Sequence, residues 1–147
     1  MTRHEVRPRL ILVVDDDRGV LDLIVTRLAL AGYRTARARD GWEAMAGIQA
    51  SRPDAILLDI NMPHLDGFGV LRRLNARPGR PPPIMVLSAR NATADIQLAL
   101  SLGAKDYLSK PFQDDMLLAR VARLLRPRPQ IAATPPPPIE QDNVILL

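Results

Sequence analysis

Cysteine is absent from the 147-residue sequence, and only two histidines, one tryptophan, two tyrosines and two phenylalanines are present. The lack of cysteine excludes disulfide frameworks and thiolate metal sites, although it leaves the redox compartment open. The net charge of +4 comes from scattered arginines rather than from a Lys/Arg-rich run. Because so few aromatic side chains are available to stack on bases, we expect no direct binding of nucleic acid.

Long hydrophobic runs are also missing. The basic start of the chain is followed by an apolar run of only five residues, Leu10 to Val14, which ends in three aspartates. This run is too short for the core of a signal peptide, and no stretch is long enough to span a membrane. The sequence therefore predicts a cytoplasmic protein without a membrane partner.

Apolar runs and helical patterns alternate along most of the chain. The strands are predicted at 10–14, 33–38, 54–58, 84–87 and 105–109, and the helices at 18–31, 41–52, 67–76, 93–102 and 113–125. The runs bury hydrophobic residues on both faces, which is typical of a parallel sheet covered by helices. The fold class is therefore α/β, with a single doubly wound (βα)5 domain and a five-stranded parallel sheet. Trp42 is placed on the inner side of the second helix, together with Ala44, Met45 and Ile48.

The last part of the sequence differs in composition. Residues 126–147 contain six prolines and show no helical period. We therefore divide the chain into an N-terminal arm (1–8), a globular domain (9–126) and a mobile, Pro-rich tail (127–147).

Polar side chains follow four of the five predicted strands. Asp15 and Asp16 end the first strand, Asp59 ends the third, Ser88 ends the fourth and Lys110 follows the fifth. The carboxyl ends of parallel strands lie along one edge of the sheet, where α/β proteins bind their ligands. Carboxylates gathered there repel each other by about 4 kcal/mol per close pair at an effective dielectric of about 20, so a cation is needed among them. With only oxygen ligands available, Mg²⁺ suits the site best.

These side chains supply the parts needed for phosphoryl transfer to a carboxylate. One carboxylate can act as the nucleophile and form an aspartyl phosphate. Catalysis of this step requires mainly positioning and charge neutralisation. Lys110 is the candidate cation, and the Ser88 hydroxyl is the candidate hydrogen-bond donor to a phosphoryl oxygen.

Four short motifs occur in the order found in one known family. They are Val13-Val14-Asp15-Asp16, Asp59 with Met62-Pro63 and Asp66-Gly67, Ser88-Ala89, and Lys110-Pro111-Phe112. Residues 9–126 thereby resemble the receiver domain of two-component response regulators and are similar to the chemotaxis regulator CheY. The resemblance implies a flavodoxin-like sheet with strand order 2-1-3-4-5.

The resemblance also implies a role for each residue of the acidic site. Asp59 would be the phosphoacceptor, and together with Asp16 it would bind Mg²⁺ directly. Asp15 would bind the metal mainly through water, and Asn61 through its backbone carbonyl. Asp17 receives no such role and is better interpreted as a helix cap.

The remaining implied roles concern switching. Lys110 would pair with the phosphoryl oxygens, and the Lys110–Pro111 peptide bond would be cis. Ser88 would be the switch hydroxyl, and Tyr107 the aromatic residue that turns inward behind it. Asn61 and Arg90 flank the pocket and would tune the lifetime of the phosphoryl group.

The implied function is that of a bacterial response regulator receiver, which is a phosphoacceptor domain and not a turnover enzyme. A histidine kinase or phosphotransfer protein would donate the phosphoryl group. The face formed by the fourth helix, fifth strand and fifth helix would then change and control an unidentified protein partner.

The output leaves two alternatives open. The last helix resembles receivers of the OmpR/PhoB type, which lead into a winged-helix DNA-binding domain, and no such domain follows here. The protein is therefore either a stand-alone receiver or the receiver portion of a longer DNA-binding regulator. Lys105, Ile96 and Ser101 replace charged residues that such receivers use to dimerise, whereas Asp106 and Arg120 are retained. This argues against that mode of association and leaves another phosphorylation-dependent dimer open.

An alternative of a different class is a Mg²⁺-dependent phosphohydrolase of the haloacid dehalogenase type. Such enzymes also use an aspartate nucleophile at a strand end, and the run Asp15-Asp16-Asp17 could supply it. The chain has no room for a cap domain, and the Asp59 loop would have no role.

Overall fold

The computed structural model describes residues 7–127, in which five strands alternate with five helices. The strands are β1 (Leu10–Val14), β2 (Arg34–Ala38), β3 (Ala55–Leu58), β4 (Ile84–Ser88) and β5 (Asp106–Ser109). The helices are α1 (Arg18–Leu30), α2 (Gly41–Ser51), α3 (Gly67–Asn75), α4 (Thr93–Ser101) and α5 (Asp114–Leu125). The arm and tail predicted from composition lie almost entirely outside the described residues.

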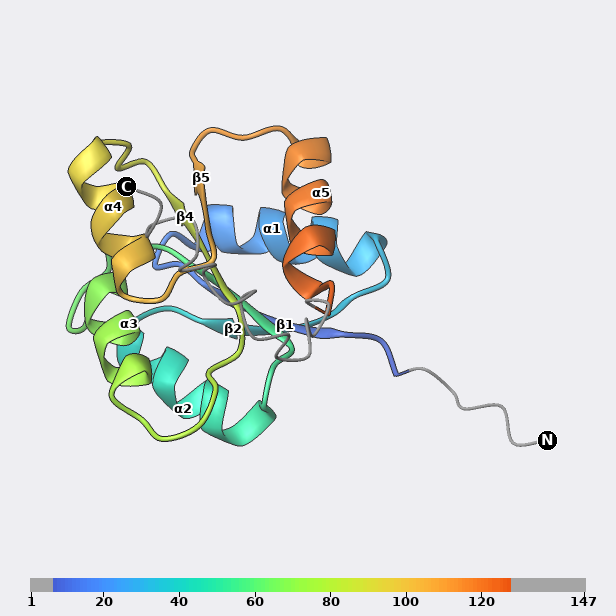
Figure 1. The fold of residues 1–147 in the computed structure, drawn as a ribbon. Coiled ribbons are helices and arrows are strands. Elements are labelled where there is room, and N and C mark those ends of the chain that lie inside the picture. The colour runs from blue at the N-terminus through green and yellow to red at the C-terminus, as the bar shows by residue number, and fades with distance from the viewer. Residues whose placement is uncertain (1–6, 128–147) are drawn as a thin grey trace, which may run out of the picture.

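All five strands are parallel and form one sheet in the order β2-β1-β3-β4-β5. Helices α1 and α5 cover one face of the sheet, and α2, α3 and α4 cover the other (Figure 1). This arrangement confirms the doubly wound α/β fold and the predicted strand order. No helix among residues 7–127 has the length and apolar character needed to cross a membrane.

The central strands are buried on both faces because alternate residues point to opposite helix layers. Leu12 and Ile56 belong to the core shared with α2, α3 and α4. Ile11 and Leu57 belong to the core shared with α1 and α5. Each such side chain contributes about 1.5–3 kcal/mol by leaving water, so the paired cores hold the sheet edge in a defined place.

Three helices begin at an aspartate that caps the first turn. Asp17 accepts a hydrogen bond from the Val20 amide, as predicted, and Asp40 and Asp66 cap α2 and α3 in the same way. These caps satisfy amides that have no partner within the helix.

The predicted inward position of Trp42 is wrong, since its side chain is 49% exposed. Gly41, Ala44, Met45 and Ile48 form the buried stripe of α2. Trp42 lies about 100° around the helix from Gly41, outside this stripe. Its ring packs instead beneath the guanidinium of Arg73 on α3, whose central carbon is 4.4 Å from the ring centroid.

Candidate functional site

The first part of the site is an acidic group at the carboxyl ends of β1 and β3. Val14 pairs with Leu58 in the sheet, so the residues that follow them, Asp15 and Asp59, are neighbours. The Asp59 amide donates to the Val14 carbonyl oxygen at 2.9 Å, which fixes the two strand ends together. Carboxylate oxygens of Asp15, Asp16 and Asp59 all lie within 4.8 Å of one another.

This acidic group has the donor chemistry and the access that a hard cation requires. Asp15 and Asp59 are buried, with 1% and 7% of their surface exposed, whereas Asp16 is exposed. The Asp17 amide donates to Asp15 Oδ1 at 2.9 Å and so orients that carboxylate. Three oxygen donors with one open side fit a divalent ion that keeps some of its waters.

Lys110 is the cation that the chain itself supplies to this group. Its Nζ lies 2.5 Å from Asp15 Oδ2 and 3.7 Å from Asp59 Oδ2. The Lys110 amide donates to the Ser88 carbonyl oxygen at 2.9 Å, so the end of β4 positions the lysine backbone. The Lys110–Pro111 peptide bond is cis, as the resemblance implied.

Asp59 has an unusual protonation equilibrium for a carboxyl group. Burial is the largest effect and, with the neighbouring Asp15, raises the pKa of Asp59 from 3.8 to about 6 despite the opposing charge of Lys110. The Ile60 amide donates to Asp59 Oδ1 at 2.8 Å and also favours the charged form. One lysine therefore does not balance the acidic group, and a second cation would favour full ionisation.

The loop after Asp59 packs closely against the start of α3. A Cβ atom added to Gly67 would lie 2.4 Å from the Asp59 carbonyl oxygen and 2.8 Å from Ile60 Cα. The Gly67 amide donates to the Ile60 carbonyl oxygen at 2.9 Å. Glycine thus permits the approach that holds the Asp59 loop in place.

The second part of the site is centred on Arg90, in the loop between β4 and α4. The Arg90 amide donates to the buried Ser88 Oγ at 3.1 Å. Its guanidinium donates to Asn61 Oδ1 at 3.1 Å and to Asp95 Oδ1 at 3.0 Å. The Tyr107 hydroxyl donates to the Arg90 carbonyl oxygen. The predicted residues Ser88, Asn61 and Tyr107 therefore meet around one arginine.

Asp95 is the member of this network that the sequence analysis missed. It lies in the first turn of α4, where an acidic residue is ordinarily interpreted as favourable to the helix dipole. Its contact with the site passes through Arg90 and depends on the path of the loop. The side chain of Asn61 is accounted for by this network, while a metal-binding role for its backbone carbonyl stays a prediction.

The family is decided by a match over most of the domain. A family model described as the response regulator receiver domain matches residues 11–122. The chain belongs to the response regulator receiver family. This receiver is 47% identical over 119 residues to response regulator MprA of Mycolicibacterium vanbaalenii, covering 81% of this chain and 51% of that protein. It is also 47% identical over 124 residues to response regulator MprA of Mycobacterium bovis, covering 84% of this chain and 54% of that protein.

Solved receiver structures are similar to this receiver over nearly their whole length. The receiver domain of Francisella response regulator 1452 superimposes with a TM-score of 0.75 and 37% identity, covering 80% of this chain and 96% of that one. The BeF3-activated N-terminal receiver domain of Klebsiella pneumoniae RstA gives a TM-score of 0.75 and 32% identity, and the match covers 80% of this chain and 99% of that one. The receiver spans about half the length of the curated MprA relatives. None of these matches supports the haloacid dehalogenase alternative.

Proposed function

We propose that this receiver accepts a phosphoryl group on Asp59 from a histidine kinase or phosphotransfer protein, and that the transfer requires Mg²⁺. Asp16, Asp59 and the Asn61 backbone carbonyl would bind the metal directly, and Asp15 would bind it through water. The observation that carries the proposal is the convergence of three carboxylates within 4.8 Å at a site that also contains Lys110. A bound Mg²⁺ would supply charge neutralisation at the phosphoryl oxygens.

The residues of the chain would act in sequence at this site. An Asp59 carboxylate oxygen attacks the phosphorus atom of the donor, forming an O–P bond as the bond from phosphorus to the donor breaks. Lys110, 3.7 Å from Asp59 Oδ2, pairs with a phosphoryl oxygen and offsets the charge that the group brings. The Ser88 hydroxyl donates to a second phosphoryl oxygen.

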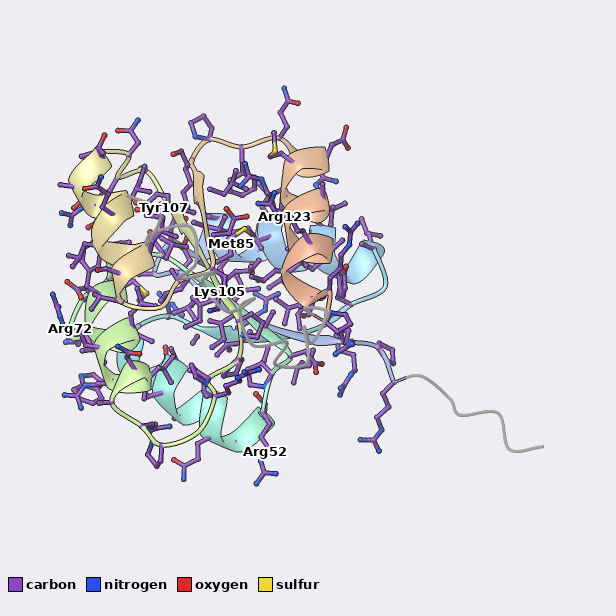
Figure 2. All side chains as sticks on the ribbon, in the orientation of Figure 1. Arg52, Arg72, Met85, Lys105, Tyr107 and Arg123 are labelled. Carbon is purple, nitrogen blue, oxygen red and sulfur yellow. The ribbon has the colours of Figure 1, made fainter. Side chains whose placement is uncertain are left out.

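Switching would follow from the network around Arg90. The phosphoryl group adds nearly two negative charges at Asp59. Movement of Ser88 toward it would break the contact from the Arg90 amide and thereby alter the loop that accepts the Tyr107 hydroxyl. Tyr107 lies on the α4 side of β5 (Figure 2), so the face made by α4, β5 and α5 would change and control a protein partner. The domain, taken as residues 9–126 between the arm and tail, would act as a cytoplasmic switch rather than a turnover enzyme.

Intact mass after incubation with acetyl phosphate and Mg²⁺ tests the proposal. We expect one added phosphoryl group on the native chain, none on Asp59→Asn, and none after chelation of the metal. Asp115→Asn is the matched control, since this exposed aspartate of α5 lies outside the site. Unchanged phosphorylation of Asp59→Asn would contradict the assignment.

The output arrangement requires a separate experiment. Because the receiver spans about half of its MprA relatives, the chain acts either alone or as the receiver portion of a longer DNA-binding regulator. An antibody against the receiver, applied to an extract of source cells, distinguishes the two by the mass of the detected band. Size measurement with and without acetyl phosphate tests a phosphorylation-dependent dimer.

A further inference from the structure

A cavity lies at the amino ends of the strands, opposite the acidic site. It has a volume of about 430 Å³ and is located where β1, β2 and β3 begin and α2 ends. Four arginines and one carboxylate are among the residues that line it, namely Arg7, Arg9, Arg34, Arg52 and Asp54. The receiver chemistry at the carboxyl ends of the strands does not use any of them.

The charges in this cavity are unequal. Asp54 is already engaged, since its Oδ2 accepts from the Leu10 amide at 2.8 Å and its Oδ1 lies 3.5 Å from an Arg9 nitrogen. Within residues 7–127, neither Arg7 nor Arg52 forms an ion pair with a carboxylate. Among the described residues, four guanidinium groups and one carboxylate line the cavity, which leaves three positive charges in a concave site. Such a field concentrates anions.

Two of these arginines, Arg34 and Arg52, have a defined contact or backbone conformation. Arg34 donates from Nε to the Pro8 carbonyl oxygen at 3.1 Å, which orients its guanidinium and uses one of its five N–H donors. Arg52 follows α2 in the left-handed region with φ 48°, where glycine or asparagine is usual. Its side chain extends away from the end of α2 in Figure 2. A favourable interaction with the carboxyl end of α2 would explain Arg52 alone and not the arginines from the segment before β1 and from β2.

The size and lining of the cavity indicate the class of ligand. A volume of about 430 Å³ lies within the range of small-molecule sites. Guanidinium groups bind phosphate oxygens in pairs. None of the described residues that line the cavity is aromatic, so none of them can stack on a base. The Ser51 hydroxyl, which also lines the cavity, donates to the Gly47 carbonyl oxygen at 2.6 Å. We propose that this cavity binds a compact oligophosphate, a chain of two or three phosphoryl groups, through Arg7, Arg9, Arg34 and Arg52.

Calorimetric titration of the full chain with sodium tripolyphosphate tests this proposal. EDTA is present so that metal binding at the acidic site does not contribute, and NaCl is kept at about 50 mM to limit screening. We expect one ligand per chain, and the double variant Arg34→Gln/Arg52→Gln should bind at least about tenfold more weakly. Arg72→Gln/Arg80→Gln removes the same charge from exposed positions outside the cavity and should change the affinity by less than about twofold.

Three results would overturn the proposal. One is the absence of binding up to about 1 mM tripolyphosphate, because a site with this charge should have a dissociation constant below that concentration. Another is an equal loss of affinity in both double variants, which would reveal attraction to net charge alone. The third is binding of a short DNA duplex without binding of tripolyphosphate, which would make this edge a nucleic-acid surface. Circular dichroism of each variant verifies that the fold is retained.

Discussion

Replacing Asp59 with asparagine should stabilise the metal-free protein at neutral pH, although it removes the proposed phosphoacceptor. Asparagine has nearly the shape of the protonated acid and can still accept the hydrogen bond that the Ile60 amide donates to Oδ1 at 2.8 Å. Lys110 keeps its closer partner, Asp15, at 2.5 Å. The substitution therefore removes mainly the cost of holding a charge in a buried position.

The magnitude follows from the pKa of Asp59, which burial raises from 3.8 to about 6. Since the folded state holds this proton to higher pH than the unfolded chain, it binds more protons between these values. The free energy of unfolding then falls as pH rises through this window. At about 1.4 kcal/mol per pKa unit, the free energy of unfolding of the native chain falls by about 3 kcal/mol in full above pH 6. Because the pocket opens to solvent beside Asp16, we expect Asp59→Asn to regain about 2 kcal/mol of this stability. At pH 4 the effect should be only about 0.5 kcal/mol.

Urea unfolding of both proteins in EDTA, at pH 4 and at pH 7.5, measures this difference. Comparison at each pH cancels the titration of all other groups that the two proteins share. Addition of Mg²⁺ at pH 7.5 should then stabilise the native chain more than Asp59→Asn, since ligand binding adds to the stability of the folded state. The control Asp115→Asn should show no gain at either pH.

The reasoning would be refuted if the Asp59→Asn variant were no more stable than the native chain at pH 7.5 in EDTA. That result would mean that the attraction between Asp59 and Lys110 outweighs burial. A gain of the same size at both pH values would indicate improved packing instead of a titration effect.

Three further predictions, made with four substitutions, concern other parts of the site and the domain. Lys110→Met should lower the free energy of unfolding by about 2–3 kcal/mol at pH 7.5 in EDTA, because it leaves two buried carboxylates without their cation. Addition of Mg²⁺ should restore much of this stability. Urea unfolding that showed no such recovery would count against a metal site there. Gly67→Ala should cost more than about 2 kcal/mol because its Cβ would meet backbone atoms at 2.4 and 2.8 Å. Gly47→Ala lies inside α2, where its Cβ would meet Leu12 Cδ1 at 3.5 Å, and should gain up to about 1 kcal/mol. Thermal unfolding that ranked the two variants in the opposite order would disprove the packing argument. Asp106→Asn should cost about 1–2 kcal/mol at pH 7, since Asp106 pairs with Arg120 at 2.7 Å. Burial acts to raise the pKa of Asp106, but the hydrogen bonds it accepts outweigh burial and lower the pKa. The cost should therefore shrink as the pH falls below about 4, and a cost independent of pH would exclude the ion pair as its source.

Local sequence was sufficient for the fold class and for the acidic half of the site, whereas the strand order followed from the resemblance to receiver domains. The apolar runs of β1, β3 and β4 indicated buried parallel strands, and in such strands the residues immediately after the last apolar position must lie at one edge. Asp15 and Asp59 were therefore placed correctly from their positions in the chain. The cap at Asp17 was likewise a local matter, since its partner lies three residues away.

Contacts that depend on side-chain direction were decided only by the tertiary structure. Trp42 lies outside the buried stripe of α2 because of its angular position, and Arg73 from another helix covers it. Asp95 joins the site because the loop after β4 carries Arg90 to it, a path that no local pattern encodes. The four arginines of the opposite cavity are spread over 45 residues of sequence, from Arg7 to Arg52, and line one cavity because β1, β2 and β3 begin at the same end of the sheet. Sequence by itself determined which strand ends carry charge, and the packing of strands and loops decided which charges meet.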